Sequence, residues 1–289
     1  TMSPAFASKS TGSLLAPNKA IGLQIYSVMR ELNADVPNGL KKIAEIGYNT
    51  IELAGYGNRK MGNYEVTEYR KLAEDAGLKI TGSHVNPRTR QYTKENLGEI
   101  AEFWKQTVED HVKLGVTTLV QPSMPTITTP DEAKFVGEVF NSNGEIAKAA
   151  GIKWGYHNHN MEFGRVTEEG APPPTNRFRP SGEVIYDLLL NNTDPALVFF
   201  EMDVYWTVMG QADPVDYFKK FAGRFPVLHI KDRAVLGESG MMNFPKIFEV
   251  AYQNGLDEFY VELEGIRDMT QYEGVKGCFE YLNNASFVK

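Results

Sequence analysis

The sequence has almost no cysteine and no excess of positive charge. Cys278 is the only cysteine in 289 residues, which excludes an internal disulfide and a zinc site made of thiolates. Acidic residues outnumber Lys and Arg by 37 to 30, giving a formal net charge of −7. Because no Lys/Arg cluster offsets that charge, we expect no nucleic-acid partner.

Two further patterns are missing. No long uncharged apolar run occurs, so we expect no membrane-spanning segment. The strand-like run at residues 22–27 is followed by VMRELNADVP, which lacks the glycine-rich phosphate loop of an open, doubly wound sheet. This absence counts against the main alternative α/β fold.

Residues 1–19, TMSPAFASKSTGSLLAPNK, are rich in Ser, Ala, Pro and Thr and have no apolar periodicity. We expect a flexible N-terminal arm there, followed by a single domain at residues 20–289. The triplet Ala5-Phe6-Ala7 fits the small-x-small pattern of a signal-peptidase site, without the charged and apolar parts of a leader. The pattern leaves the compartment open and slightly favours export to the periplasm over the cytoplasm.

One unit recurs along the rest of the chain. A helix-period segment ends in glycine and is followed by a short β-branched or aromatic run. A glycine just past the last helical turn supplies the left-handed residue that closes a helix. Most of these glycines are about 30–40 residues apart, the length of a strand, a helix and two loops. They are Gly47, Gly77, Gly115, Gly151, Gly223 and Gly255.

The pattern predicts eight strands, each followed by a helix, with the last helix at residues 271–284. Eight βα units that close on themselves form a (β/α)8 TIM barrel, and this α/β fold is our prediction. The insert at residues 161–183 has three consecutive prolines and little periodicity, so we expect a long loop that can act as a lid. The expected strands cover residues 20–27, 48–54, 78–84, 117–121, 152–157, 196–203, 225–231 and 258–264.

In each of the last four strand-like runs an imidazole or a carboxylate stands where the apolar stretch stops, namely His157, Asp203, His229 and Glu262. In a parallel barrel the C-terminal ends of the strands meet at one face, so these side chains are predicted to converge. Two nitrogen and two oxygen ligands suit one divalent ion, with Mn²⁺ or Zn²⁺ first and Co²⁺, Fe²⁺ or Mg²⁺ as alternatives. The competing interpretation is that polar residues simply stand where strands meet solvent.

Side chains alternate along a strand, so parity identifies further residues that point the same way. His159, Lys231 and Glu264 share parity with the predicted ligands and lie one step further out, where they would contact substrate. Glu262 is the predicted base, because a carboxylate ligand can also move protons, and His159 or Lys231 is the partner acid.

The earlier strands and one aromatic residue complete the predicted site. Gln24, Glu52, His84 and Gln121 lie at or near the ends of their runs and are predicted to bind substrate. Trp206 offers a flat face to a sugar ring. The alternatives are an ion pair for Glu52, a structural role for His84 and core packing for Trp206.

Five segments resemble the xylose isomerase-like TIM barrels, which include sugar-phosphate isomerases and epimerases, ketose 3-epimerases, inosose-converting enzymes and endonuclease IV-type proteins. The resemblance runs from about residue 20 to the C-terminus. It implies one divalent metal, often Mn²⁺, and matches Asp203, His229 and Glu262 to family ligands on strands six to eight. The segments are GLQIYSV, GYHNHNMEF, EMDVYW with MGQADP, LHIKDR and YVELEG.

This sequence departs from the 3-epimerases of the family at strand five. Those enzymes have a glutamate there that is both ligand and base, whereas this chain has His157, with Glu162 as a less well-spaced substitute. The YHNH pattern is closer to the inosose dehydratase-like and keto-sugar-processing branches. The endonuclease branch needs three zinc ions and more ligands than five histidines provide, so we do not expect DNA repair.

The resemblance implies a metal-dependent isomerase or epimerase that acts on a small-molecule carbohydrate, a keto-sugar or a related polyol. A base would remove the proton next to a carbonyl, and the return of that proton would isomerise or epimerise the resulting enediolate. Loss of a leaving group would instead make a dehydratase or lyase, and a non-catalytic sugar-binding barrel is a third alternative. The family also leaves room for a homo-oligomer.

Overall fold

The computed structural model describes residues 19–170 and 181–289. The predicted arm, apart from Lys19, and the central part of the predicted lid therefore lie outside the described residues. No helix in the described part of the chain is long and apolar enough to cross a membrane.

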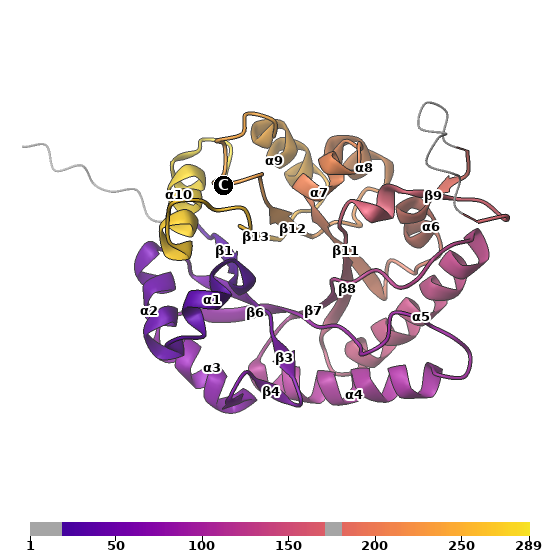
Figure 1. The fold of residues 1–289 in the computed structure, drawn as a ribbon, viewed down its shortest axis with the longest axis horizontal. Coiled ribbons are helices and arrows are strands. Elements are labelled where there is room, and N and C mark those ends of the chain that lie inside the picture. Colours follow the sequence, from indigo (N-terminus) through magenta and orange to yellow (C-terminus); the bar gives the residue numbers. More distant parts are fainter. Residues whose placement is uncertain (1–18, 171–180) are drawn as a thin grey trace, which may run out of the picture.

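Eight parallel strands close into a barrel in the order β1-β13-β12-β11-β8-β7-β6-β2, with the helices around the outside (Figure 1). The barrel closes where β1 pairs with β13, in the register Gly22 opposite Tyr260 and Leu23 opposite Val261. The predicted (β/α)8 barrel is confirmed. Its strands are β1 (Gly22–Gln24), β2 (Thr50–Leu53), β6 (Lys79–His84), β7 (Thr118–Gln121), β8 (Lys153–His157), β11 (Val198–Asp203), β12 (Val227–Ile230) and β13 (Glu258–Val261).

Helices begin and end where local chemistry predicts. The helices that follow Asp35, Thr129 and Asp213 each start with Pro at the first turn, and the side chain before it accepts a backbone N–H. All six predicted helix-ending glycines have positive φ, from 77° at Gly151 to 123° at Gly47. The longer helices are α2 (Val36–Ile46), α3 (Val66–Asp75), α4 (Leu97–Leu114), α5 (Pro130–Ala149), α6 (Ile185–Asn191), α8 (Pro214–Lys220), α9 (Phe244–Gln253) and α10 (Gln271–Asn284).

Several short elements lie at the C-terminal face of the barrel, and these were not predicted. Strands β3 (Tyr56–Gly57), β4 (Lys60–Met61) and β5 (Tyr64–Glu65) form a small antiparallel sheet after β2. Strands β9 (Arg165–Val166) and β10 (Glu183–Val184) pair within the insert after β8. Two-residue strands are too short to show a period, so no sequence pattern marks them. The remaining short helices are η1 (Ile25–Val28), α1 (Met29–Leu32), η2 (Met161–Phe163) and α7 (Val204–Met209).

Apolar side chains close the barrel beneath the candidate site. Val120, Phe199, Val227 and Tyr260, from four different barrel strands, form a buried cluster separate from the larger core against the helices. Gly155 makes room for Phe199, because a Cβ atom at position 155 would lie 2.5 Å from the Phe199 ring. The polar side chains nearer the strand C-termini therefore lie above a packed apolar layer.

Candidate metal centre and active site

Four polar side chains meet at the C-terminal ends of the last four barrel strands. His157 ends β8, Asp203 ends β11, His229 lies in β12, and Glu262 directly follows β13. One ligand atom from each lies within 4.8 Å of those from the other three, and all four residues are buried. We call this set the outer cluster.

Asp203 has a carboxylate oxygen that suits a cation. Its Oδ1 atom accepts the backbone N–H of Trp206 at 2.8 Å, which caps α7. Its Oδ2 atom is buried and has no hydrogen-bond partner among the described residues. Burial, with a further contribution from Glu262, raises the pKa of Asp203 to about 7 despite the opposing charge of Lys231. A buried oxygen without a donor, beside two imidazoles and a second carboxylate, suits a divalent ion.

Carboxylates fix the orientation of both imidazoles in the outer cluster. His229 Nε2 lies 2.6 Å from Glu52 Oε2, and its Nδ1 lies 3.1 Å from Glu262 Oε2. His157 Nδ1 lies 3.2 Å from Glu201 Oε2. Such carboxylate–histidine pairs set the ring orientation and basicity of metal-binding histidines.

A second group of potential ligands lies deeper in the barrel, and we call it the inner cluster. It consists of His84, His157, Glu201 and His229, whose ligand atoms also lie within 4.8 Å of one another. His84 stacks on His229 with ring centroids 4.9 Å apart and ring planes at 8°. Glu201 was not among the predicted site residues, although its parity with Asp203 on the same strand was a usable signal.

Lys231 and two ring systems border the outer cluster. Lys231 Nζ lies 3.2 Å from Glu262 Oε2 and 2.7 Å from Glu264 Oε1, and 5.0 Å above the Trp206 ring. Burial lowers the pKa of Lys231, but Glu262, Asp203 and Glu264 together outweigh it and raise that pKa above its ordinary value. The half-buried His159 ring lies 5.1 Å from the ring of His157, and burial lowers its pKa to about 4. Near neutral pH the site therefore offers a charged amine and a neutral imidazole.

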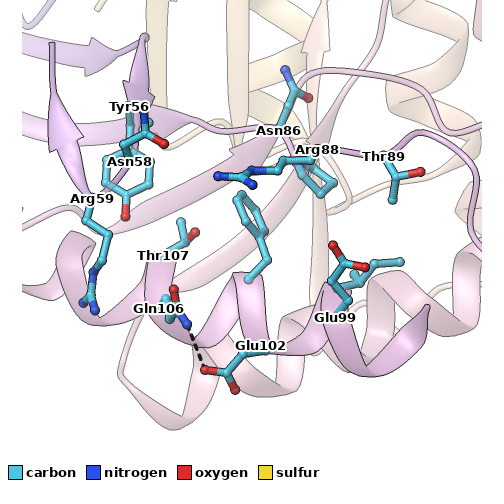
Figure 2. Close-up of a pocket in the computed structure, with 14 residues that line it drawn as sticks. Tyr56, Asn58, Arg59, Asn86, Arg88, Thr89, Glu99, Glu102, Gln106 and Thr107 are labelled. Atoms are coloured by element: carbon cyan, nitrogen blue, oxygen red, sulfur yellow. Dashed lines mark hydrogen bonds between the residues drawn. The ribbon is translucent and has the colours of Figure 1, made fainter.

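A cavity of about 480 Å³ lies at the rim of the barrel (Figure 2). The hairpin β3–β4 contributes Tyr56, Asn58 and Arg59, the segment after β6 contributes Asn86 and Arg88, and α4 forms the third wall. Among the residues that line it, none belongs to the inner or outer cluster. The cavity is therefore separate from the candidate metal centre.

A model of the xylose isomerase-like TIM barrel matches residues 40–282, most of the chain. The chain belongs to this family. The predicted family resemblance is thereby confirmed. A sugar phosphate isomerase/epimerase of known structure from Parabacteroides distasonis is 52% identical, with a TM-score of 0.88 over 94% of this chain and all of that one.

Two further similarities are weaker. An inosose dehydratase from Clostridium tetani is 29% identical over 106 residues, 37% of this chain. The chain matches only 30% of that relative's length. The structure of 3-keto-D-glucoside 4-epimerase from E. coli is 14% identical, with a TM-score of 0.67 over 92% of this chain and 98% of that one, which shows a shared fold.

The sequence offered two candidates for the ligand at the end of the fifth barrel strand, His157 and Glu162. The structure places His157 in both clusters. Glu162, the alternative, is buried elsewhere: it accepts hydrogen bonds from the Tyr156 hydroxyl at 2.5 Å and from the His159 backbone N–H at 3.0 Å. Its place beside Tyr156 leaves the strand-five position to an imidazole.

The predicted substrate contacts fall into two groups. Gln24 and Glu52 are fully buried and joined by a 2.8 Å hydrogen bond, and Gln121 is buried between Tyr92 and the Ser123 carbonyl. His84 and Trp206 are partly exposed beside the clusters. Substrate contact remains a prediction for all five residues, but Gln24, Glu52 and Gln121 already have partners within the chain.

Proposed function

We propose that this protein is a divalent-metal-dependent sugar isomerase or epimerase that removes a proton next to the carbonyl of a keto-sugar or related polyol. One observation carries the proposal: ligand atoms of His157, Asp203, His229 and Glu262 converge within 4.8 Å at the face where TIM-barrel enzymes act. The family to which the chain belongs supports the same class of substrate.

The four residues of the outer cluster would hold the ion. When bound, a divalent ion polarises a substrate carbonyl as a Lewis acid. Lys231 and His229 lower the pKa of Glu262 well below its usual range, against the effect of burial. Glu262 is therefore ionised and can take a proton from the carbon next to the carbonyl.

Lys231 is placed to complete the proton transfer. Its charged Nζ atom lies within 3.2 Å of Glu262 and can stabilise an enediolate or donate a proton to it. His159 is neutral near pH 7 because its pKa is about 4, so it would orient a substrate hydroxyl or accept a proton. Trp206, packed against Lys231, offers a ring face to the sugar.

Solvent exchange tests this proposal. The Mn²⁺-loaded protein, incubated in D₂O with free ketoses, inososes and 3-keto-glycosides, should place deuterium on the carbon next to the carbonyl of its true substrate. A substrate deuterated at that carbon should also turn over several-fold more slowly if removal of the deuterium limits the rate. Transfer of the deuterium from that carbon to another carbon of the product, without exchange with solvent, would indicate a hydride shift and contradict proton abstraction.

A dehydratase or lyase is the second candidate, and the strand-five histidine favours it. Because position 157 holds a histidine, the outer cluster lacks the second carboxylate base of the 3-epimerases. It has Glu262 as both ligand and base, with Lys231 beside it. The partial similarity to an inosose dehydratase points the same way. Mass spectrometry separates the two reactions, since an epimer keeps the mass of the substrate and elimination lowers it by a water or an alcohol.

A further inference from the structure

The inner cluster has the composition of a metal site in its own right. His84, His157 and His229 bring imidazole nitrogens to Glu201, and their ligand atoms lie within 4.8 Å of one another. Three of these residues are buried, and the His84 side chain is 10% exposed. The outer cluster uses His157 and His229 but neither His84 nor Glu201.

Glu201 is the centre of this arrangement. Its Oε2 atom lies 2.6 Å from His84 Nε2, 3.2 Å from His157 Nδ1 and 3.2 Å from His229 Nε2. A tetrahedral ion with bonds of about 2.0–2.1 Å holds its ligand atoms about 3.3 Å apart. Small shifts of the side chains would therefore admit an ion between these four atoms.

Two unpartnered oxygens provide independent support. Glu201 Oε1 and Glu52 Oε1 are buried and have no hydrogen-bond partner among the described residues. Glu52 Oε2 also lies 2.6 Å from His229 Nε2 and 3.3 Å from His84 Nε2. The two buried carboxylates share the same histidine nitrogens, and each still has an oxygen without a partner. A bound cation would satisfy these oxygens better than one proton on each imidazole ring would.

We propose that the barrel holds two alternative metal positions, an inner one that selects Zn²⁺ and the outer one that selects Mn²⁺. The inner cluster offers three imidazoles and one carboxylate, and imidazole-rich sites suit Zn²⁺. The outer cluster offers two of each, and Mn²⁺ accepts carboxylates more readily. A neutral imidazole has one lone pair, so His157 and His229 serve one ion at a time.

X-ray absorption at the zinc edge tests this proposal directly. The chelator-treated protein is loaded with one equivalent of Zn²⁺, and the scattering is fitted for the number of imidazoles. We expect three imidazoles in the wild type and also in Asp203→Asn, which removes an outer ligand only. A fit of two imidazoles in the wild type, or a failure to bind Zn²⁺, overturns the proposal.

Matched variants test the selectivity. His84→Gln should weaken Zn²⁺ binding at least about tenfold more than it weakens Mn²⁺ binding, as measured by calorimetry. Asp203→Asn should do the reverse. Equal losses for both ions in His84→Gln would mean that His84 only orients the other ligands, and would overturn an inner position. This test of the metal positions does not depend on the proposed function. The proposed function is contradicted separately, if the Mn²⁺-loaded protein turns over no substrate.

Discussion

His229 uses both of its ring nitrogens, and it thereby links residues from both halves of the barrel. Nδ1 faces Glu262 from β13, and Nε2 faces Glu52 from β2. The Gln24 amide in turn donates to Glu52. A chain of contacts therefore runs from β1 through β2 to a predicted metal ligand on β12, and residues predicted to touch substrate also position the histidine.

Glu262→Gln tests the predicted base. Glutamine keeps the size of the side chain but loses its basicity and its negative charge, so turnover should fall by at least about 100-fold. Metal content must be measured alongside activity, to separate a lost base from a lost ion. Glu264→Gln is the matched control, since it also removes a carboxylate beside Lys231 but should leave the base intact. Normal turnover by metal-loaded Glu262→Gln would exclude Glu262 as the base.

At the residue scale, strand-end reasoning found four side chains that the structure holds together, because strand polarity and parity are visible in a sequence. Glu201 escaped this reasoning because it lies inside the run VFFEMD, not at its end. Its importance depends on a contact across the barrel, with His84 on β6, which is not a neighbour of β11. A local pattern does not show which side chains of non-adjacent strands meet.

At the scale of elements, the hairpin β3–β4 is held to α4 by a buried carboxylate. Asp110 accepts hydrogen bonds from Arg59 Nε and from the Tyr56 hydroxyl, both at 2.8 Å, and from Lys113 at 3.2 Å. Asn58 and Arg59 form the tip of the hairpin with φ of 50° and 63°, left-handed values that side chains rarely adopt. The ion pair with Asp110 helps to hold Arg59 in that conformation.

Asp110 should make stability depend on pH in the acid range. Burial raises the pKa of Asp110, but hydrogen bonds from Arg59, Tyr56 and Lys113 outweigh it and lower that pKa to about 2. The contribution of the ionised Asp110 to stability is present above the pKa of an aspartate in the unfolded chain, near 4. It is lost as the pH falls through the folded-state pKa of about 2. We expect Asp110→Asn to cost about 1–3 kcal/mol at pH 7 and progressively less between about pH 5 and pH 2.

Urea unfolding at several pH values measures this difference. Glu138→Gln, which changes an exposed carboxylate on α5, is the control and should be close to the wild type throughout. A cost for Asp110→Asn that stays constant down to about pH 2 would contradict the role of the charge.

The contact of α5 with the segment between α6 and β11 requires glycine. A Cβ atom at Gly137 would lie 2.7 Å from the Asn192 backbone oxygen, so Gly137→Ala should push the helix outward and cost about 1–3 kcal/mol. Gly98→Ala on α4 is the control, since nothing lies within 4 Å of its Cβ position, and it should be neutral or stabilise by up to about 1 kcal/mol. Thermal unfolding of both variants checks the contrast, and equal effects would contradict it.

Elements longer than about a turn could be predicted because glycine caps and apolar periods mark them. Helix α10 was expected at residues 271–284 and lies at Gln271–Asn284. The sheet of β3, β4 and β5 could not be predicted, because it depends on side-chain contacts with α4, such as that of Arg59 with Asp110. Long-range ion pairs leave no periodic trace in a sequence.

At the scale of the whole molecule, metal and fold should stabilise one another. The predicted ligands come from β8, β11, β12 and the end of β13, so a bound ion would link half of the barrel strands. Elemental analysis should find one divalent ion per chain, and its removal by chelation should lower the melting temperature. An excess of Mn²⁺ about 100-fold over its Kd should restore about 2.7 kcal/mol, whereas Ca²⁺, which prefers oxygen ligands, should restore little. Two tightly bound ions per chain would contradict a single ion.

The closure of the barrel also has a consequence for synthesis. Strand β1 pairs with β13, although 233 residues separate Gln24 from the start of β13 at Glu258. A chain emerging from the ribosome would expose one edge of β1 and an incomplete ligand set until Glu262 and the residues after it had left the exit tunnel. Ion capture and ring closure would thus have to wait for β13 and Glu262, and a chain truncated before β13 would be an open sheet with two unpaired edges for chaperones or proteases to recognise.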